Sequence, residues 1–341
     1  MKVLITSVPF GNLPGHASLN LLEAAGLEYK LNPAGRRLTE RELMDHLQDS
    51  SILIAGTEPI TARAMDTAPQ LKLIARVGIG LDNVDLEEAR KREIAVTYTP
   101  DAPSAAVAEM TIGLMLDLLR NISRADRLMH SKEWSRLMGR RLNGLTVGVV
   151  GIGRVGKRVI RILRGGFPNA TVLANDIEPD SAFGNEHGLT WVDKGKLYTQ
   201  SDILTLHLPL TRTTRRLIGE REISAMQPSA FIINTSRGAI VDEIALASAL
   251  LSGRLAGAAI DVYEEEPYSG ILTEVEKCVL TCHMGSMSLD CRAAMEMEAV
   301  EDVLRFVRGE PLRQPVPEWE YLTSSLSLQS SSDAPRKREP N

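Results

Sequence analysis

In the stretch Val147-Gly148-Val149-Val150-Gly151-Ile152-Gly153-Arg154-Val155-Gly156, a glycine-rich turn joins an apolar strand to a helix. This local pattern indicates the type of fold. We predict the strand over 145–150 and the helix over 155–164. In a dinucleotide-binding unit the first glycine permits the tight bend, the second lets a pyrophosphate approach the backbone, and the third lets the helix pack against the sheet. The N–H groups at the start of the helix then face the phosphates.

A second strand, predicted over 171–175, leads directly to Asp176. A carboxylate at this position accepts hydrogen bonds from the adenosine ribose and repels a 2′-phosphate, so the sequence predicts NAD rather than NADP. The alternative is purely structural, with glycines that only form a turn and an aspartate that caps the next segment. The residues predicted here to contact NAD are Gly151, Gly153, Arg154, Val155, Gly156 and Asp176.

Outward from this turn, short apolar runs alternate with amphipathic stretches, which is typical of parallel sheets covered by helices on both faces. Further strands are predicted over 2–7, 51–56, 71–76, 94–98, 202–207, 229–234, 256–261 and 278–281, and further helices over 39–48, 86–91 and 244–251.

Two long helical segments divide the chain. One runs from Ala105 to about Met129 with a break near Arg120-Asn121, and the other covers 288–308 after the last strand. We therefore predict an α/β protein with two doubly wound parallel-sheet domains. A discontinuous, flavodoxin-like substrate domain would cover 1–102 and 288–322, and a Rossmann domain would cover 103–287. The serine-rich stretch 323–341 predicts a disordered tail.

Composition limits the class of protein. The chain has 341 residues, of which 43% are hydrophobic and 24% charged, as in soluble globular proteins. A net charge of -5 argues against a general nucleic-acid partner. No apolar run reaches the roughly 18 residues of a membrane span, and the N-terminal run is too short for a signal peptide.

The cysteines Cys278, Cys282 and Cys291 are odd in number, which indicates reduced thiols and a cytoplasmic location rather than disulfides. Cys278, Cys282 and His283 lack a second pair of ligands elsewhere, so no metal is expected.

Three later segments place polar side chains at predicted strand ends, where open α/β sheets bind their ligands. They are N-T-S-R-G at 234–238, A-I-D-V-Y-E-E-E-P at 259–267 and L-T-C-H-M-G-S at 280–286. Arg237 can grip a carboxylate through two parallel hydrogen bonds, and histidine is suited to proton transfer near neutral pH. Taken singly, each residue could equally be an ordinary surface or strand-end group.

Together with the glycine turn, these segments occur in the order and spacing typical of the D-2-hydroxyacid dehydrogenases, and the resemblance covers about residues 50–310. It implies that Arg237 binds the substrate carboxylate and polarises the C2 carbonyl, and that His283 is the general acid or base. Glu266 would orient the imidazole and stabilise its protonated form, and Asp261 would contact the nicotinamide carboxamide. The resemblance also implies a homodimer. The contacts with NAD that it implies are His207, Leu208, Pro209, Thr235, Ser236, Arg237, Asp261, His283 and Gly285.

The segment R-V-G-I-G-L-D-N-V-D at 76–85 resembles the substrate loop of that family. The N–H groups of Val77 and Gly78 are expected to bind a carboxylate oxygen, and Arg76 is expected to approach an anionic distal group, as in phosphoglycerate dehydrogenase-like members. Alternatively, the segment is a glycine-rich turn in which Asp82 or Asp85 caps the next helix. Both interpretations can hold together.

The sequence thus predicts an NAD-dependent enzyme that interconverts a D-2-hydroxyacid and a 2-oxoacid. The main expectation is the pair 3-phosphoglycerate and 3-phosphohydroxypyruvate, and the alternative is glyoxylate, hydroxypyruvate or a phosphonate-type oxoacid. A regulatory domain like that of long phosphoglycerate dehydrogenases is not expected. An NAD-sensing, corepressor-like scaffold is the alternative of another class, although a scaffold does not need the set Arg237, Glu266 and His283.

One departure from the family pattern stands beside the histidine. Cys282 occupies a position where relatives usually have proline. We expect this difference to change the rigidity of the loop more than its chemistry.

Overall fold

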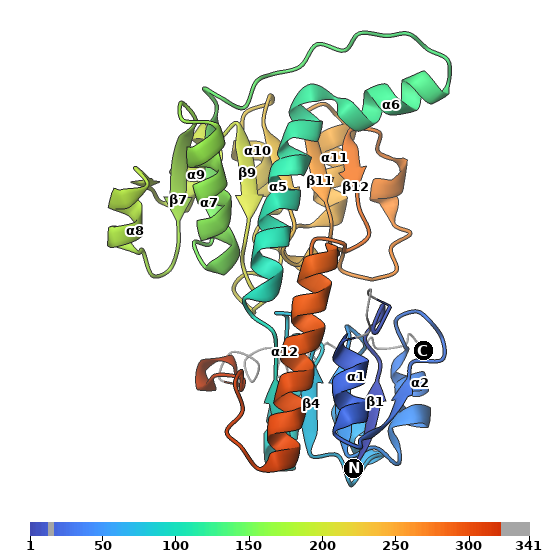
Figure 1. Ribbon diagram of the computed structural model, residues 1–341. Helices are drawn as coiled ribbons and strands as arrows, with labels where there is room; N and C mark the ends of the chain where they lie inside the picture. The colour runs from blue at the N-terminus through green and yellow to red at the C-terminus, as the bar shows by residue number, and fades with distance from the viewer. Residues whose placement is uncertain (13–16, 322–341) are drawn as a thin grey trace, which may run out of the picture. The chain divides into compact units, whose positions relative to one another are not determined.

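The computed structural model describes residues 1–12 and 17–321, which form two compact units of alternating strands and helices (Figure 1). Unit 1 combines Met1–Pro103 with the chain from Ser288 onward, and unit 2 is Ser104–Met287. Each unit contains one parallel sheet, which confirms the predicted fold class. The stretch 323–341, for which we predicted a disordered tail, lies outside the described residues.

Unit 1 contains a five-stranded sheet in the order β2-β1-β3-β4-β5, the flavodoxin-like order that the sequence predicted. Its strands are β1 (Lys2–Ile5), β2 (Glu28–Leu31), β3 (Ile52–Ala55), β4 (Leu73–Arg76) and β5 (Ala95–Thr97). Its helices are α1 (Ala17–Ala24), α2 (Glu40–Leu47), α3 (Ala62–Asp66), α4 (Leu86–Lys91) and α12 (Leu289–Arg308). Helices α2, α3 and α4 share one apolar core with the sheet, whereas α1 packs against α12, and α12 packs against β3 and β4.

Local chemistry sets the helix ends in unit 1. The Thr39 hydroxyl accepts the N–H of Glu42, and the Glu42 carboxylate accepts the N–H of Thr39 at 2.8 Å, so a capping box starts α2. The Asp85 carboxylate accepts the N–H of Glu88 at 3.0 Å and starts α4. The cap that we predicted as an alternative for Asp85 is therefore present.

Buried polar groups bind α12 to the first part of the chain. The Glu296 carboxylate accepts the N–H of Gly11 and the hydroxyl of Ser18, both at 3.1 Å. The guanidinium of Arg292 donates to the hydroxyl of Ser7 at 3.2 Å. Both charged side chains are buried, so the packing of α12 on this unit depends on these partners being in place.

Unit 2 contains a seven-stranded parallel sheet in the order β12-β11-β10-β9-β6-β7-β8. Its strands are β6 (Thr146–Val150), β7 (Thr171–Asn175), β8 (Thr190–Trp191), β9 (Ile203–Leu206), β10 (Phe231–Asn234), β11 (Gly257–Ile260) and β12 (Cys278–Leu280). Its helices are α5 (Ala102–Arg120), α6 (Ile122–His130), α7 (Arg154–Gly166), α8 (Ser181–Glu186), α9 (Lys194–Gln200), α10 (Glu220–Ala225) and α11 (Glu243–Leu251), with short 3-10 turns η1 (Gly238–Ile240) and η2 (Ile271–Glu274). The strand order reverses between β6 and β9, the position at which doubly wound sheets bind their ligands.

The long helix that we predicted after residue 105 is two helices, α5 (Ala102–Arg120) and α6 (Ile122–His130). Asn121 separates them with a left-handed φ of 55°, at the place where we predicted a break. By length and composition alone, α5 could cross a membrane. It nevertheless contributes Ile112, Met115 and Leu119 to the apolar core of unit 2, so it is a core helix.

Candidate active site

The glycine turn after β6 has the backbone that the sequence predicted. Gly151 has a φ of +89°, and a Cβ atom there would lie 2.3 Å from the carbonyl oxygen of His207. A Cβ on Gly156 would lie 2.1 Å from the carbonyl oxygen of Gly151, so α7 approaches the turn as closely as it does only because this residue lacks a side chain. A Cβ on Gly153 would meet no atom within 4 Å.

This open space at Gly153 lies where α7 begins, because Gly153 is the N-cap residue and Arg154 and Val155 form the first turn of the helix. Helix N-termini attract phosphate groups through their N–H groups and the helix dipole. The turn therefore leaves open space beside Gly153, where a phosphate could approach the backbone. This agreement between the backbone and the chemistry of a dinucleotide supports NAD as the ligand of the site.

Asp176 lies directly after β7 and next to the turn. One carboxylate oxygen accepts the N–H of Ile152 at 2.6 Å, and the other accepts the N–H of Glu178 at 3.0 Å. The structural role that we weighed for Asp176 is therefore present. It also holds the carboxylate beside the turn, where a ribose contact would be made.

His207 follows β9 on the other side of the switch point. Its Nε2 lies 3.0 Å from the hydroxyl of Thr205, while Nδ1 is buried and has no hydrogen-bond partner within the described part of the chain. Burial lowers the pKa of His207 to about 3, so the ring is neutral at physiological pH. The neighbouring Leu208 lies against the turn, with Cδ2 3.0 Å from the Cβ position of Gly151.

The turn after β10 is built around Asn234, a fully buried side chain. Its oxygen accepts the N–H of Ser236 at 3.1 Å and the hydroxyl of Ser236 at 2.8 Å, and its nitrogen donates to the carbonyl of Arg237 at 2.8 Å. The guanidinium of Arg237 donates to the carbonyl of Ser236 at 2.7 Å. Thr235 lies 2.8 Å from the hydroxyl of Thr111 on α5. The sequence identified Arg237, but not the asparagine that shapes its turn.

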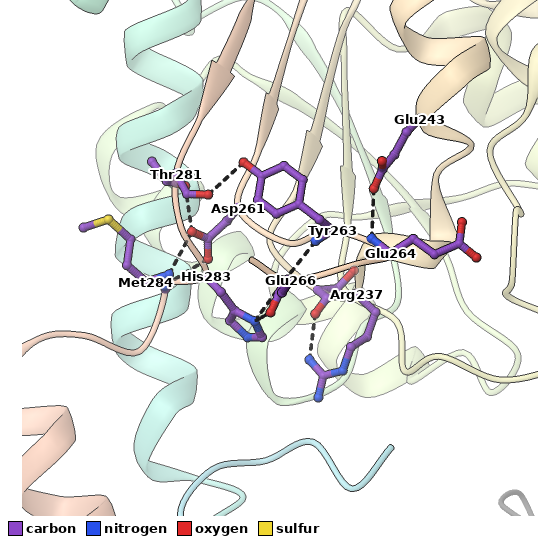
Figure 2. A network of polar contacts seen from close by, with 11 residues as sticks. Arg237, Glu243, Asp261, Tyr263, Glu264, Glu266, Thr281, His283 and Met284 are labelled. Carbon is purple, nitrogen blue, oxygen red and sulfur yellow. Dashed lines mark hydrogen bonds and ion pairs between the residues drawn. The ribbon is translucent and has the colours of Figure 1, made fainter. Parts of the chain in front are cut away.

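Glu266 and His283 come together although they follow different strands. Nδ1 of His283 lies 2.8 Å from one carboxylate oxygen of Glu266 and 3.1 Å from the other, as Figure 2 shows. Arg237, which follows β10, lies in the same view. The bond to Glu266 places a proton on Nδ1, which leaves Nε2 to exchange a proton with a substrate.

The loop that carries His283 is bound to Asp261, which follows β11. The Asp261 carboxylate accepts the hydroxyl of Thr281 at 2.6 Å and the N–H groups of Met284 and Gly285, each at 2.9 Å. The N–H of His283 donates to the Asp261 carbonyl at 2.7 Å. His283 itself has a left-handed φ of 52°, which costs a non-glycine residue about 1–3 kcal/mol unless its surroundings fix it.

Tyr263 connects several of these groups and was missed by the sequence reasoning. Its N–H donates to Glu266 at 3.1 Å, and its hydroxyl donates to the carbonyl of Thr281 at 2.8 Å. A Cβ on Gly238, next to Arg237, would lie 1.9 Å from the backbone of Tyr263. The only signal in the sequence was its place in the 259–267 segment, where an aromatic residue reads as core packing.

The loop after β4 in unit 1 uses its polar groups internally. Arg76 is 6% exposed, and its guanidinium donates to Asn83 at 3.3 Å and to the carbonyl of Val77. The N–H of Val77 donates to the carbonyl of Ala55 at 2.9 Å, and the N–H of Gly78 donates to the hydroxyl of Thr99 at 2.7 Å. The expected contacts of these three loop residues with a substrate therefore gain no support from the geometry.

The cysteines form no cluster with other ligands, and no group of three His, Cys, Asp or Glu side chains suited to a metal occurs within 1–12 and 17–321. Burial raises the pKa of Cys278 to about 12 and that of Cys291 to about 11, so both are thiols at neutral pH. Cys282 is exposed.

Comparison with known proteins agrees with this geometry. Residues 112–285 match the profile of the family described as D-isomer specific 2-hydroxyacid dehydrogenase, NAD binding domain. A glyoxylate reductase from Thermococcus litoralis is 38% identical over 279 residues, which cover 79% of this chain and 84% of that protein. A D-3-phosphoglycerate dehydrogenase from Methanocaldococcus jannaschii is 36% identical over 80% of this chain and 53% of that protein. The apo-structure of D-lactate dehydrogenase from Escherichia coli superposes with a TM-score of 0.81 at 27% identity, over 93% of this chain and all of that one.

The fold and the matches define the class: the chain belongs to the D-isomer specific 2-hydroxyacid dehydrogenases. Within that class it is an NAD-dependent oxidoreductase that acts on 2-hydroxyacids or 2-oxoacids.

The glycine turn yields a matched pair of variants. We expect Gly153→Ala to leave the free energy of unfolding within about 0.5 kcal/mol of the native value but to weaken NADH binding at least about 10-fold, because its methyl group enters the pyrophosphate space. We expect Gly156→Ala to destabilise the fold by about 1–3 kcal/mol, because its methyl group meets the turn itself. Urea unfolding and fluorescence titration with NADH measure the two effects. A native dissociation constant for NADH in the Gly153→Ala variant would contradict the placement of the pyrophosphate.

His207 should make stability depend on pH. The folded ring stays neutral, whereas the unfolded chain binds a proton below a pKa of about 6.5, so stability is present above that pH and is lost as the pH falls. We expect His207→Asn to remove about 1–2 kcal/mol of the stability lost between pH 7 and pH 5. Urea unfolding of both proteins at the two pH values measures this difference. Equal losses in the two proteins would show that the ring is protonated in the folded state.

Proposed function

We propose that this enzyme reduces a small, unphosphorylated 2-oxoacid of the glyoxylate or hydroxypyruvate type with NADH. The observation that carries the proposal is the pairing of His283 with Glu266 at 2.8 Å, beside the turn that holds Arg237. The relative from Thermococcus litoralis is named a glyoxylate reductase, and it is matched over most of its length. The buried, internally bonded Arg76 also favours a substrate without a distal phosphate, since no charge from this residue is presented to one.

The residues of unit 2 divide the work of the reaction. The glycine turn would hold NADH with Asp176 at its ribose, and the bound cofactor would supply the hydride that C2 of the oxoacid receives. The guanidinium of Arg237 binds the substrate carboxylate and polarises the C2 carbonyl. Nε2 of His283 gives its proton to the carbonyl oxygen, and the Glu266 carboxylate stabilises the protonated imidazole before that step.

Further contacts complete the proposed cofactor site. Thr235, Ser236 and Gly285 would line the nicotinamide pocket, and Asp261 would contact the carboxamide while it holds the loop of His283. His207, Leu208 and Pro209 would lie beside the adenosine half. Unit 1 would be the substrate domain, and Val77 and Gly78 would contribute to carboxylate binding if their present hydrogen bonds open.

A panel of oxoacids tests this function. We expect NADH oxidation with glyoxylate or hydroxypyruvate to exceed that with 3-phosphohydroxypyruvate by at least about 10-fold in kcat/KM.

We expect His283→Asn to lower kcat at least about 1000-fold with little change in NADH affinity, because only the proton transfer is lost. Arg237→Ala should chiefly raise KM for the oxoacid.

NADPH should be a poor substitute for NADH, and Asp176→Ala should reduce the preference for NADH over NADPH.

The panel has two adverse outcomes. A preference for 3-phosphohydroxypyruvate would replace the small substrate with the phosphorylated one, in accord with the name of the relative from Methanocaldococcus jannaschii. Turnover that survives in the His283→Asn variant would remove that side chain from the mechanism.

We also propose a homodimer. Helix α6 buries none of its side chains, and the stretch that follows it exposes large apolar groups, with Trp134 at 82% and Met138 at 95% exposure. Ile122 and Met129 on α6 are more than half exposed as well. Contiguous apolar groups on a soluble protein usually mark a surface that a partner covers, and a second copy is the partner that the resemblance to the family implies.

Sedimentation at micromolar concentration tests the dimer. We expect the native protein to sediment as a dimer and the double variant Trp134→Asp, Met138→Asp to sediment as a folded monomer, because two charges would enter an apolar interface. Ile177→Asp, at a position 94% exposed and distant in sequence from this stretch, is the control and should remain dimeric. A native protein that sediments as a monomer would contradict the proposal.

We place the enzyme in the cytoplasm. Its cysteines are free, and two of them are buried as thiols, which suits a reducing compartment.

A further inference from the structure

The loop over 281–285 carries His283 in a conformation that its own sequence does not impose. His283 has a left-handed φ, and the residue before it, Cys282, is not one that restricts the backbone as proline would. A flexible backbone next to the histidine would scatter the position of the imidazole. Hydrogen bonds from elsewhere must therefore fix the loop.

Tyr263 supplies one of these bonds through its hydroxyl. It is 8% exposed, and its single hydroxyl proton is shared between the carbonyl of Thr281 at 2.8 Å and that of Ile260 at 3.0 Å. The first carbonyl belongs to the loop and the second to the last residue of β11, so one hydroxyl joins the two. The ring is fixed by stacking on Tyr268, with 4.1 Å between the ring centres and 15° between their planes.

Asp261 holds the same loop through its carboxylate. Its carboxylate accepts the hydroxyl of Thr281 and the N–H groups of Met284 and Gly285. Thr281 is thus bound through its carbonyl and through its side chain, while two N–H groups just after His283 are bound as well. We call Asp261, Tyr263 and Thr281 the loop clamp.

The backbone of Tyr263 also supports the partner of the histidine. Its N–H donates to the Glu266 oxygen that lies 3.1 Å from Nδ1 of His283. Through its hydroxyl and its N–H, this one residue fixes the imidazole loop and the carboxylate that pairs with it (Figure 2).

We propose that Tyr263 is a positioning residue for His283, and that its hydroxyl, together with Asp261, gives the loop over 281–285 its rigidity. The inference rests on the proposed role of His283 in proton transfer. It assigns no contact between Tyr263 and substrate or cofactor.

Position 282 allows the loop to be stiffened in another way, by a proline. Within the described residues, the N–H of Cys282 makes no hydrogen bond, and its side chain is exposed. A proline there would remove no donor that the structure uses. Cys282→Pro is therefore a rescue variant, since it stiffens the loop without the tyrosine hydroxyl.

The kinetic experiment is a double-mutant cycle with glyoxylate and NADH. We expect Tyr263→Phe to lower kcat about 3- to 10-fold, the equivalent of one hydrogen bond, while the NADH dissociation constant changes less than about 2-fold. Cys282→Pro alone should change kcat less than about 2-fold. The double variant should recover to within about 2-fold of Cys282→Pro. A loss in the double variant as large as in Tyr263→Phe would overturn the proposal.

Tyr268→Phe is the matched control. Its hydroxyl accepts the N–H of Leu272 at 3.1 Å and makes no contact with the loop of His283. It should therefore keep the native kcat, and an equal loss in both phenylalanine variants would overturn the proposal. Thr281→Val, which removes the bond to Asp261, should lower kcat in the same direction as Tyr263→Phe, and a native kcat in both variants would also overturn it.

Amide hydrogen exchange tests the clamp without any substrate. We expect Tyr263→Phe to speed exchange of the Met284 and Gly285 amides at least about 3-fold, while strand β6 keeps its native protection. Unchanged exchange at both amides would overturn the proposal, whatever the enzyme reduces. If the native protein turned over no oxoacid, the proposed function would fail, and this measurement would still decide the clamp.

Discussion

Parallel pairing of β9, β10, β11 and β12 is the constraint on which the site depends. Because the four strands run in one direction, the loops that follow them leave the sheet at one edge. The register pairs Leu206 with Asn234, Asn234 with Ile260, and Ile260 with Leu280, so the four strands end level with one another. Four residues of the site follow these strand ends within three residues: His207, Arg237, Asp261 and His283.

Two carboxylates at this edge serve two separate purposes. Glu266 is fixed by a backbone N–H and faces the imidazole, whereas Asp261 faces the backbone of the loop that bears the imidazole. One acid orients the ring and the other holds its support. Separate acids for these tasks keep the ring position independent of its charge, since Asp261 stays bonded whether or not His283 is protonated.

The sequence predicted those parts of the molecule that depend on local chemistry. The turn at 151–156 is one, because Gly151 has a positive φ and Gly156 lies against the backbone of Gly151. The break at Asn121 is another, because asparagine tolerates a left-handed φ. Strand β2 was missed because it is largely exposed and has no apolar run, and β8 was missed because it has only two residues. The helices α8, α9 and α10 were missed for a similar reason, since each has seven residues or fewer and little periodicity to detect.

At the site, motif order predicted Arg237, Glu266 and His283, and their roles stay predictions. It could not predict what supports them, because the hydroxyl of Tyr263 reaches a carbonyl 18 residues away, which no local pattern records. The contact of Arg76 with a distal anion stays a prediction. In the structure its guanidinium donates to Asn83 and to the carbonyl of Val77 in its own loop.

The division of unit 1 between two distant stretches of chain has a consequence for synthesis on the ribosome. Its five strands are made first, but α12, which covers β3 and β4 and buries Arg292 and Glu296 against Ser7, Gly11 and Ser18, is made only after all of unit 2. The nascent chain thus carries a half-covered sheet while residues 104–287 emerge and fold. Whatever shields that apolar face in the meantime, chaperone or transient collapse, acts for the time that 184 further residues take to translate.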